Sequence, residues 1–147
     1  MRPLCKTNSL KRLNLTLLRE TMAICRMEPT ECIPAWVVDN SFCSVTRTKE
    51  ELSLVCPEKR VPKGVKSDRS WCCLKVQGPV ALSMTGVLAS LAAPLAEAGI
   101  SVFVVSTYDT DYLLVKKEDL GRATRVLRQA GHNFRQKPPT KRTHLKS

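Results

Sequence analysis

ISVFVVSTYDTDYLLV, residues 100–115, is the stretch that decides the fold. Its first part, Ile100 to Ser106, is an almost unbroken run of β-branched and aromatic residues, which is typical of a central strand. A polar connection follows at residues 107–111, and Tyr112 to Val115 reads as a second short strand. The stretch therefore predicts two adjacent strands joined by a polar turn.

Helical periodicity flanks this stretch on both sides. The apolar positions before it fall on one stripe of a helix that ends at Gly99. Pro94 lies inside that helix and removes the hydrogen bond to the carbonyl of Ser90, so we expect a kink or a tight last turn. A second helix over 118–131 has acidic residues at its start and a glycine at its end.

A strand over 71–77 precedes the first helix, and a possible last strand lies near 133–134. The order of elements is then strand, helix, strand, strand, helix and strand. This order predicts an α+β fold of the ferredoxin-like βαββαβ type, with both helices on one face of an antiparallel sheet.

The first half of the chain is rich in strands and poor in helix. Strands are expected over 13–18, 22–27, 42–46 and 52–55, and prolines between the second and third leave little room for a helix. We interpret this half as a degenerate copy of the same module that shares a sheet with the second. The predicted organisation is a basic tail (1–12), a degenerate unit (13–69), a complete unit (70–134) and a second basic tail (135–147).

The net charge of +11 lies almost entirely at the two ends of the chain. Such basic, proline-containing ends are typical of solvated disordered tails, so nucleic acid is not the expected partner. Weak contacts with RNA or acidic surfaces, or a targeting role for the first segment, are the alternatives. The longest apolar run, Val102 to Val105, is far too short to cross a bilayer, which predicts a soluble protein.

The chain shows no pattern of an enzyme, metal centre or cofactor site. Its seven cysteines include no C-x-x-C pair, and the two histidines cannot complete a zinc site, so we interpret the cysteines as core residues in a reducing compartment. No G-x-G-x-x-G or phosphate loop occurs, and no nucleophile can be paired with a base. We therefore expect no cofactor and no metal.

Polar residues gather at one end of the predicted hairpin. Asp109 and Asp111 could perform acid–base chemistry or hold a divalent ion, whereas a solvated turn is the simpler reading of Asp109. Backbone N–H groups at residues 83–86, where the first helix begins, suit a carboxylate. A zwitterion needs an acceptor for its ammonium group and donors for its carboxylate. The aspartates and the backbone N–H groups supply these, so the pattern favours an amino-acid ligand.

Three segments together resemble one family. Residues 92–102, 106–111 and 114–115 are similar to the ACT domains of the CASTOR arginine sensors and their small bacterial relatives. Residues 42–48 with 52–55 look like the first unit of the same proteins. The resemblance covers about residues 15–134 and implies an amino-acid-binding regulatory fold without catalysis.

The resemblance also implies a binding site with two walls, between two ACT units. One wall has Ser101 and Val102, and the other has Thr107, Tyr108 and the charged contact Asp111. A glycine and a glutamate that complete the sensors' pocket are replaced here, which puts arginine itself in doubt. The replacing residues are Ala81 and Met84.

The sensors have four such units and this chain has two, so the site would be built across a homodimer. The expected function is a cytoplasmic, non-catalytic module that binds a free amino acid and regulates a partner protein. One alternative is a structural interaction module whose pocket has decayed. Another is a metal-dependent enzyme that uses Asp109 and Asp111.

Overall fold

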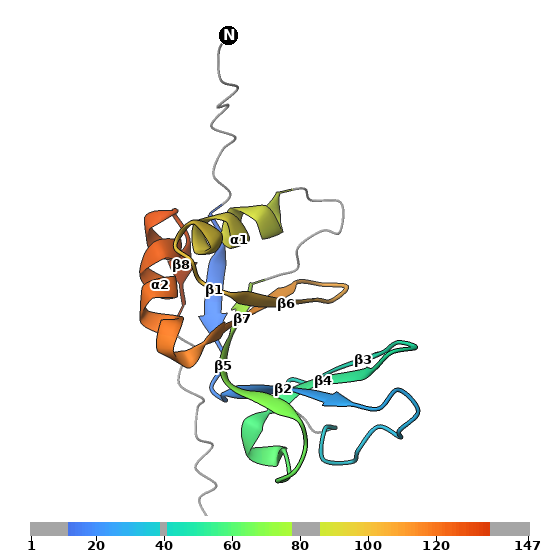
Figure 1. Cartoon of the computed structure of the whole chain (residues 1–147). Helices are drawn as coiled ribbons and strands as arrows, with labels where there is room; N and C mark the ends of the chain where they lie inside the picture. The colour runs from blue at the N-terminus through green and yellow to red at the C-terminus, as the bar shows by residue number, and fades with distance from the viewer. Residues whose placement is uncertain (1–11, 39–40, 78–85, 136–147) are drawn as a thin grey trace, which may run out of the picture.

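The computed structural model describes residues 12–38, 41–77 and 86–135. In these residues eight strands form one continuous, bent sheet (Figure 1). Its order is β3-β4-β2-β5-β1-β8, and β7 followed by β6 extends from the other edge of β5. The strands are β1 (Asn14–Leu17), β2 (Met22–Met27), β3 (Ser44–Arg47), β4 (Leu52–Pro57), β5 (Ser67–Val76), β6 (Val102–Ser106), β7 (Asp111–Lys116) and β8 (Asn133–Phe134).

The ten-residue strand β5 joins the two halves of the sheet. One of its edges pairs with β2 and then with β1, and its other edge pairs with β7. The register of the β2–β5 pair shifts between Met22 and Ile24, and Ser70 adopts a left-handed φ of +67° in the same part of β5. Such irregularities increase local twist and bend a strand. They account for the angle between the two halves in Figure 1.

The first strand of the chain lies inside the sheet of the second half. β1 is antiparallel to β5 on one side and parallel to β8 on the other. The order across this part of the sheet is therefore β8-β1-β5-β7-β6. The two predicted units are interleaved in space, because a strand from the beginning of the chain separates the first and last strands of the second unit.

Helices α1 (Val87–Glu97) and α2 (Leu120–Gln129) cover one face of this part of the sheet (Figure 1). A short 3₁₀ helix, η2 (Lys117–Asp119), precedes α2. Each α-helix ends at a glycine with positive φ, Gly99 at +70° and Gly131 at +99°, as the sequence predicts. The helices bury their apolar stripes against alternate residues of the strands. The buried residues of this core are Leu13, Leu15, Cys72, Leu74, Val76, Val87, Leu91, Leu95, Ile100, Leu113, Val115, Ala123 and Leu127.

The side chain of His132 contacts a backbone carbonyl of α1 that Pro94 leaves without its helical hydrogen bond. The sequence does not reveal this contact. Pro94 cannot donate a hydrogen bond to the carbonyl of Ser90. The Nε2 of His132 lies 3.0 Å from that oxygen, and the backbone N–H of Leu13 donates to its Nδ1 at 3.2 Å. Because a backbone N–H can only donate, Nδ1 accepts this bond, and Nε2 is the ring nitrogen that can donate to the carbonyl of Ser90. The buried ring of His132 therefore links α1 to the start of β1.

Besides β1, the first half of the described chain contains β2, β3 and β4, with a 3₁₀ helix, η1 (Glu58–Arg60), and irregular segments. Residues 28–38 form no regular helix, as their prolines predict. One face of these strands packs under Val37 and Val61, and the other face packs in the bend of the sheet, where Phe42 stacks near Tyr112 with ring centroids 4.6 Å apart.

The structure confirms the strands expected in both halves, although several ends differ by one to four residues and Asp111, expected in the polar connection, lies in β7. β5 begins at Ser67, four residues before the predicted start. β6 was predicted to be central but lies at the edge of the sheet, because it pairs with β7 alone in the described part of the chain. Its sequence is nonetheless continuously apolar because both of its faces are covered. Val102 and Val104 pack against the helix-side core, and Phe103 and Val105 pack in the bend.

Candidate functional site

The turn between β6 and β7 is held by its own threonines. The N–H of Thr107 donates to the carbonyl of Thr110 at 2.8 Å, and the N–H of Thr110 donates to Oγ1 of Thr107 at 3.3 Å. The buried hydroxyl of Thr110 donates to the carbonyl of Val76 at 2.7 Å. These bonds attach the polar turn to the end of β5, so its side chains project from a fixed position.

Asp111 lies at the start of β7 and is half-buried. The hydroxyl of Ser106, which is directly opposite, donates to Oδ1 of Asp111 at 2.6 Å. Among the described residues this is the only hydrogen bond of that carboxylate. Tyr108 is 82% exposed and Asp109 is exposed. Asp111 thus keeps acceptor capacity for a cationic group, whereas Asp109 faces solvent.

The two predicted walls lie at opposite ends of β6. Val102 pairs with Val115 at one end, and Ser106 pairs with Asp111 at the other. Ser101 and Ser106 are five residue steps apart along the strand, which is about 16 Å. Within a single chain the structure therefore does not bring Ser101 close to Asp111. Ala81 and Met84 lie outside the described residues.

The free edge of β6 presents an alternating set of backbone groups. In an antiparallel pair, residues that are hydrogen-bonded to each other alternate with residues whose N–H and C=O groups point away. The bond from Thr107 to the Thr110 carbonyl fixes this alternation in the hairpin. Val102, Val104 and Ser106 are then the residues whose N–H and C=O groups point away from β7, toward the open edge.

The cysteines occupy mostly apolar positions. Cys25, Cys56, Cys72 and Cys73 are buried, and Cys32 is exposed. Burial raises the pKa of Cys73 to about 12 and also raises that of Cys72. The contact with Cys25 and burial raise the pKa of Cys56. These three thiols are therefore protonated at neutral pH and act as small hydrophobic side chains.

In the described ranges, no three His, Cys, Asp or Glu side chains converge as a metal site would require. None of the described helices is long and apolar enough to span a membrane.

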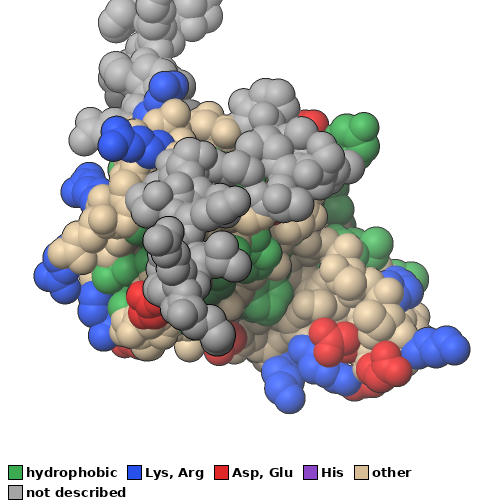
Figure 2. All heavy atoms as spheres, turned by 90° about the horizontal axis from the view of Figure 1, so that it is seen from above, with side chains coloured by type: hydrophobic (Ala, Val, Ile, Leu, Met, Phe, Trp, Pro, Cys, Tyr) green, Lys and Arg blue, Asp and Glu red, His purple; other side chains and the backbone are tan. Residues whose placement is uncertain are grey.

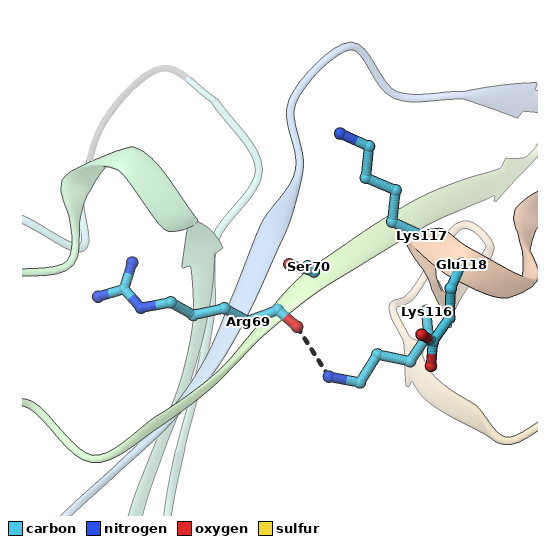
Figure 3. Close-up of a pocket in the computed structure, with 5 residues that line it drawn as sticks. All are labelled: Arg69, Ser70, Lys116, Lys117 and Glu118. Atoms are coloured by element: carbon cyan, nitrogen blue, oxygen red, sulfur yellow. Dashed lines mark hydrogen bonds between the residues drawn. The ribbon is translucent and has the colours of Figure 1, made fainter.

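A shallow polar pocket of about 510 Å³ lies where β5 bends (Figure 3). Two of its cationic side chains, those of Arg69 and Lys116, donate hydrogen bonds to backbone carbonyls around the bend. The guanidinium of Arg69 donates to the carbonyls of Glu58 and Val61 at 3.0 and 3.2 Å, and it points away from Lys117 (Figure 3). The ammonium of Lys116 donates to the carbonyl of Arg69 at 2.8 Å. The pocket is therefore explained by the backbone conformation that these side chains support.

The left-handed φ of Ser70 at this bend gives a test of strain. We expect Ser70→Gly to stabilise the fold by about 0.5–1 kcal/mol, because glycine adopts positive φ without steric cost. Ser70→Val is expected to destabilise it by more than 1 kcal/mol, because branching at Cβ worsens the clash. Urea unfolding measures both. A Gly variant less stable than the natural chain would show that this position is not strained.

Two family models and several known proteins are similar in sequence to this chain. A family model described as an ACT domain matches residues 66–129, and a model described as an N-terminal domain matches residues 20–64. The chain is 34% identical over 99 residues to the human "Putative protein CASTOR3P", covering 58% of this chain and 61% of that protein. It is 36% identical over 90 residues to the bovine "Cytosolic arginine sensor for mTORC1 subunit 1", covering 54% of this chain and 27% of the sensor.

A solved bacterial structure matches over nearly its whole length. Protein Atu0741 from Agrobacterium tumefaciens has a TM-score of 0.82 and 42% sequence identity, and the match covers 86% of this chain and 95% of that one. The fold and these matches together define an ACT-domain protein, and the chain belongs to that family. Within the family it is a relative of the CASTOR arginine sensors, although it spans less than two thirds of their length. The resemblance seen in the sequence is confirmed.

Proposed function

We propose that this chain is a non-catalytic regulatory module that binds a free amino acid at the interface of a homodimer. The observation that carries the proposal is the edge strand β6. Among the described residues it has apolar side chains and backbone groups without a partner along its length, and one predicted wall of the site lies at each end. Exposed apolar edge strands readily pair with another chain.

Antiparallel pairing of β6 with β6 of a second copy would bring the two walls together. Val104 is the middle residue of β6, and its N–H and C=O groups point to the free edge. A two-fold axis at Val104 places Ser101 opposite the partner's Thr107. It also places Val102 opposite the partner's Ser106, beside which lies the partner's Asp111. The interface then contains two equivalent sites, as two-fold symmetry requires.

The chemistry of the combined site fits a zwitterion. The carboxylate of Asp111 provides an acceptor for an ammonium group, and its contact with Ser106 leaves further lone pairs free. The hydroxyl and backbone N–H of Ser101 are suited to the ligand's carboxylate, whereas the N–H and hydroxyl of Thr107 already donate to the carbonyl of Thr110. Because the resemblance places Met84 where the sensors have an acid, we propose that neutral amino acids bind at least as well as arginine.

The bovine relative is named a cytosolic sensor, and we propose a cytoplasmic location for this chain as well. A ligand that contacts both copies stabilises one arrangement of the dimer over others. In our proposal a partner protein recognises that arrangement, so amino-acid supply regulates the partner. No catalytic step is part of this function.

Thermal unfolding of the full chain with each common amino acid tests the proposal. A ligand at one hundred times its dissociation constant adds about 2.7 kcal/mol to the free energy of unfolding. For a domain of this size that raises the melting temperature by roughly 5–10 °C.

Asp111→Ala is expected to weaken the best ligand by about 1.5–3 kcal/mol, because a charge-assisted acceptor is lost. Asp109→Ala is the matched control, since that carboxylate faces solvent, and it is expected to leave affinity unchanged. If no amino acid shifts the melting temperature at millimolar concentration in a confirmed dimer, the interaction module with a decayed pocket is the correct reading.

A further inference from the structure

A second pocket, of about 420 Å³, lies at the open end of the helix-side core, between α2, β1, β5 and β8. It shares no residue with β6 or its turn. Its volume is within the range of small-molecule sites, about 300–1,000 Å³. The pocket has an apolar floor and a cationic rim, and no part of the proposed function uses it.

The floor is a continuation of the core that α2 does not cover. It consists of Leu17, Leu74, Leu120 and Phe134. Leu17 follows Leu15 on the same face of β1, yet Leu15 is fully buried and Leu17 is 43% exposed. Exposed apolar surface inside a concave pocket is the usual feature of a ligand site.

The rim carries Arg128 of α2 and Arg135, which follows β8. The guanidinium of Arg128 lies 5.3 Å from the ring centroid of Phe134. Among the described residues, no carboxylate lies within ion-pair distance of either arginine, whereas Arg122 of the same helix pairs with Asp119 at 3.3 Å. Figure 2 shows Lys and Arg side chains gathered along the side of the molecule that carries α2.

The other polar group of the pocket does not offer a free donor. The hydroxyl of Thr124 donates to the carbonyl of Leu120 at 2.8 Å. The hydrogen bonds available to a ligand therefore come from two guanidinium groups, which favour an anion and repel an ammonium. A free amino acid fits this arrangement poorly, because its ammonium group would lie near the two arginines.

We propose that this pocket binds a small amphipathic carboxylate, with its alkyl chain on the leucine floor and its carboxylate between Arg128 and Arg135. The chain's own residues 136–147 are a poor occupant. They carry Lys137, Lys141, Arg142 and Lys146 and no acidic side chain, so they repel the rim. This site is independent of the amino-acid site at β6.

Calorimetric titration of the full-length protein with butanoate, hexanoate and octanoate tests the proposal. Affinity is expected to rise about fourfold for each added methylene, because each one buries further apolar surface. Octan-1-ol and octylamine test the charge, and both are expected to bind at least tenfold more weakly than octanoate. Amide chemical shifts are expected to change at Leu17, Leu74 and Phe134.

Arg128→Gln is expected to weaken octanoate at least tenfold. Arg125→Gln removes the same charge from the same helix outside the pocket and is the matched control. Leu17→Gln makes the floor polar and is expected to reduce the gain per methylene. Neither Arg128→Gln nor Leu17→Gln is expected to change the response to amino acids.

Four results would overturn the proposal. These are no octanoate binding at millimolar concentration, equal affinity for octanoate and octanol, equal losses in the Arg125 and Arg128 variants, and binding that appears only after removal of residues 136–147. The last result would assign the pocket to the chain's own end.

Discussion

Val104→Pro is expected to convert the proposed dimer to monomers and to abolish the proposed thermal response to amino acids. The N–H of Val104 points to the open edge of β6, so proline there removes no hydrogen bond to β7. It does remove a donor at the centre of the proposed β6–β6 pairing. Because each site needs both copies, affinity for the amino acid is expected to fall at least 100-fold with the dimer.

Light scattering and thermal unfolding measure the two effects in the same samples. Val104→Ala is the control, because it shortens the same side chain and keeps the backbone donor. We expect this variant to remain dimeric and responsive to the ligand. A Val104→Pro protein that stays dimeric would place the interface elsewhere. A monomer that still binds the amino acid would show that the site is complete in one chain.

His132→Phe is expected to destabilise the fold by about 2–5 kcal/mol. The substitution keeps a buried ring but leaves the carbonyl of Ser90 and the N–H of Leu13 without partners. Each unsatisfied buried group costs about 1–3 kcal/mol. Urea unfolding followed by circular dichroism gives the change in the free energy of unfolding.

Pro94→Ala separates the hydrogen bonds of His132 from its packing. Alanine at position 94 restores an N–H that can donate to the carbonyl of Ser90, so this carbonyl no longer depends on His132. In the Pro94→Ala background, His132→Phe is expected to cost about 1–2 kcal/mol less than in the natural chain. Equal costs in both backgrounds would mean that His132 contributes through packing alone.

The elements with strong local signals were predicted well from the sequence. β2 and β8 have the expected bounds, and both helices end at the predicted glycines. These elements are decided by neighbours within a few residues, through side-chain alternation and through the conformational freedom of Gly99 and Gly131. The polar turn after β6 and the exposed position of Asp109 were predicted for the same reason.

The candidate site was predicted only in part. Ser101, Thr107 and Asp111 were identified through a resemblance, and the structure shows where each one lies along the β6–β7 hairpin. Their meeting in one site depends on a second copy of the chain, so their role stays a prediction. No pattern in the sequence predicted the pocket rimmed by Arg128 and Arg135, because its residues come from four elements far apart in the sequence.

The sequence by itself determined the order of the strands and helices and several of their ends, because these follow from local periodicity and turn residues, and its resemblance to known sensors indicated the ACT family. Only the tertiary structure decided that β1 lies between β5 and β8, that β6 is an edge strand, and that His132 bonds the carbonyl freed by Pro94. Each of these joins residues that are distant along the chain. β6 is the clearest case, because its two faces are covered by different cores and its sequence therefore cannot distinguish an edge from a centre.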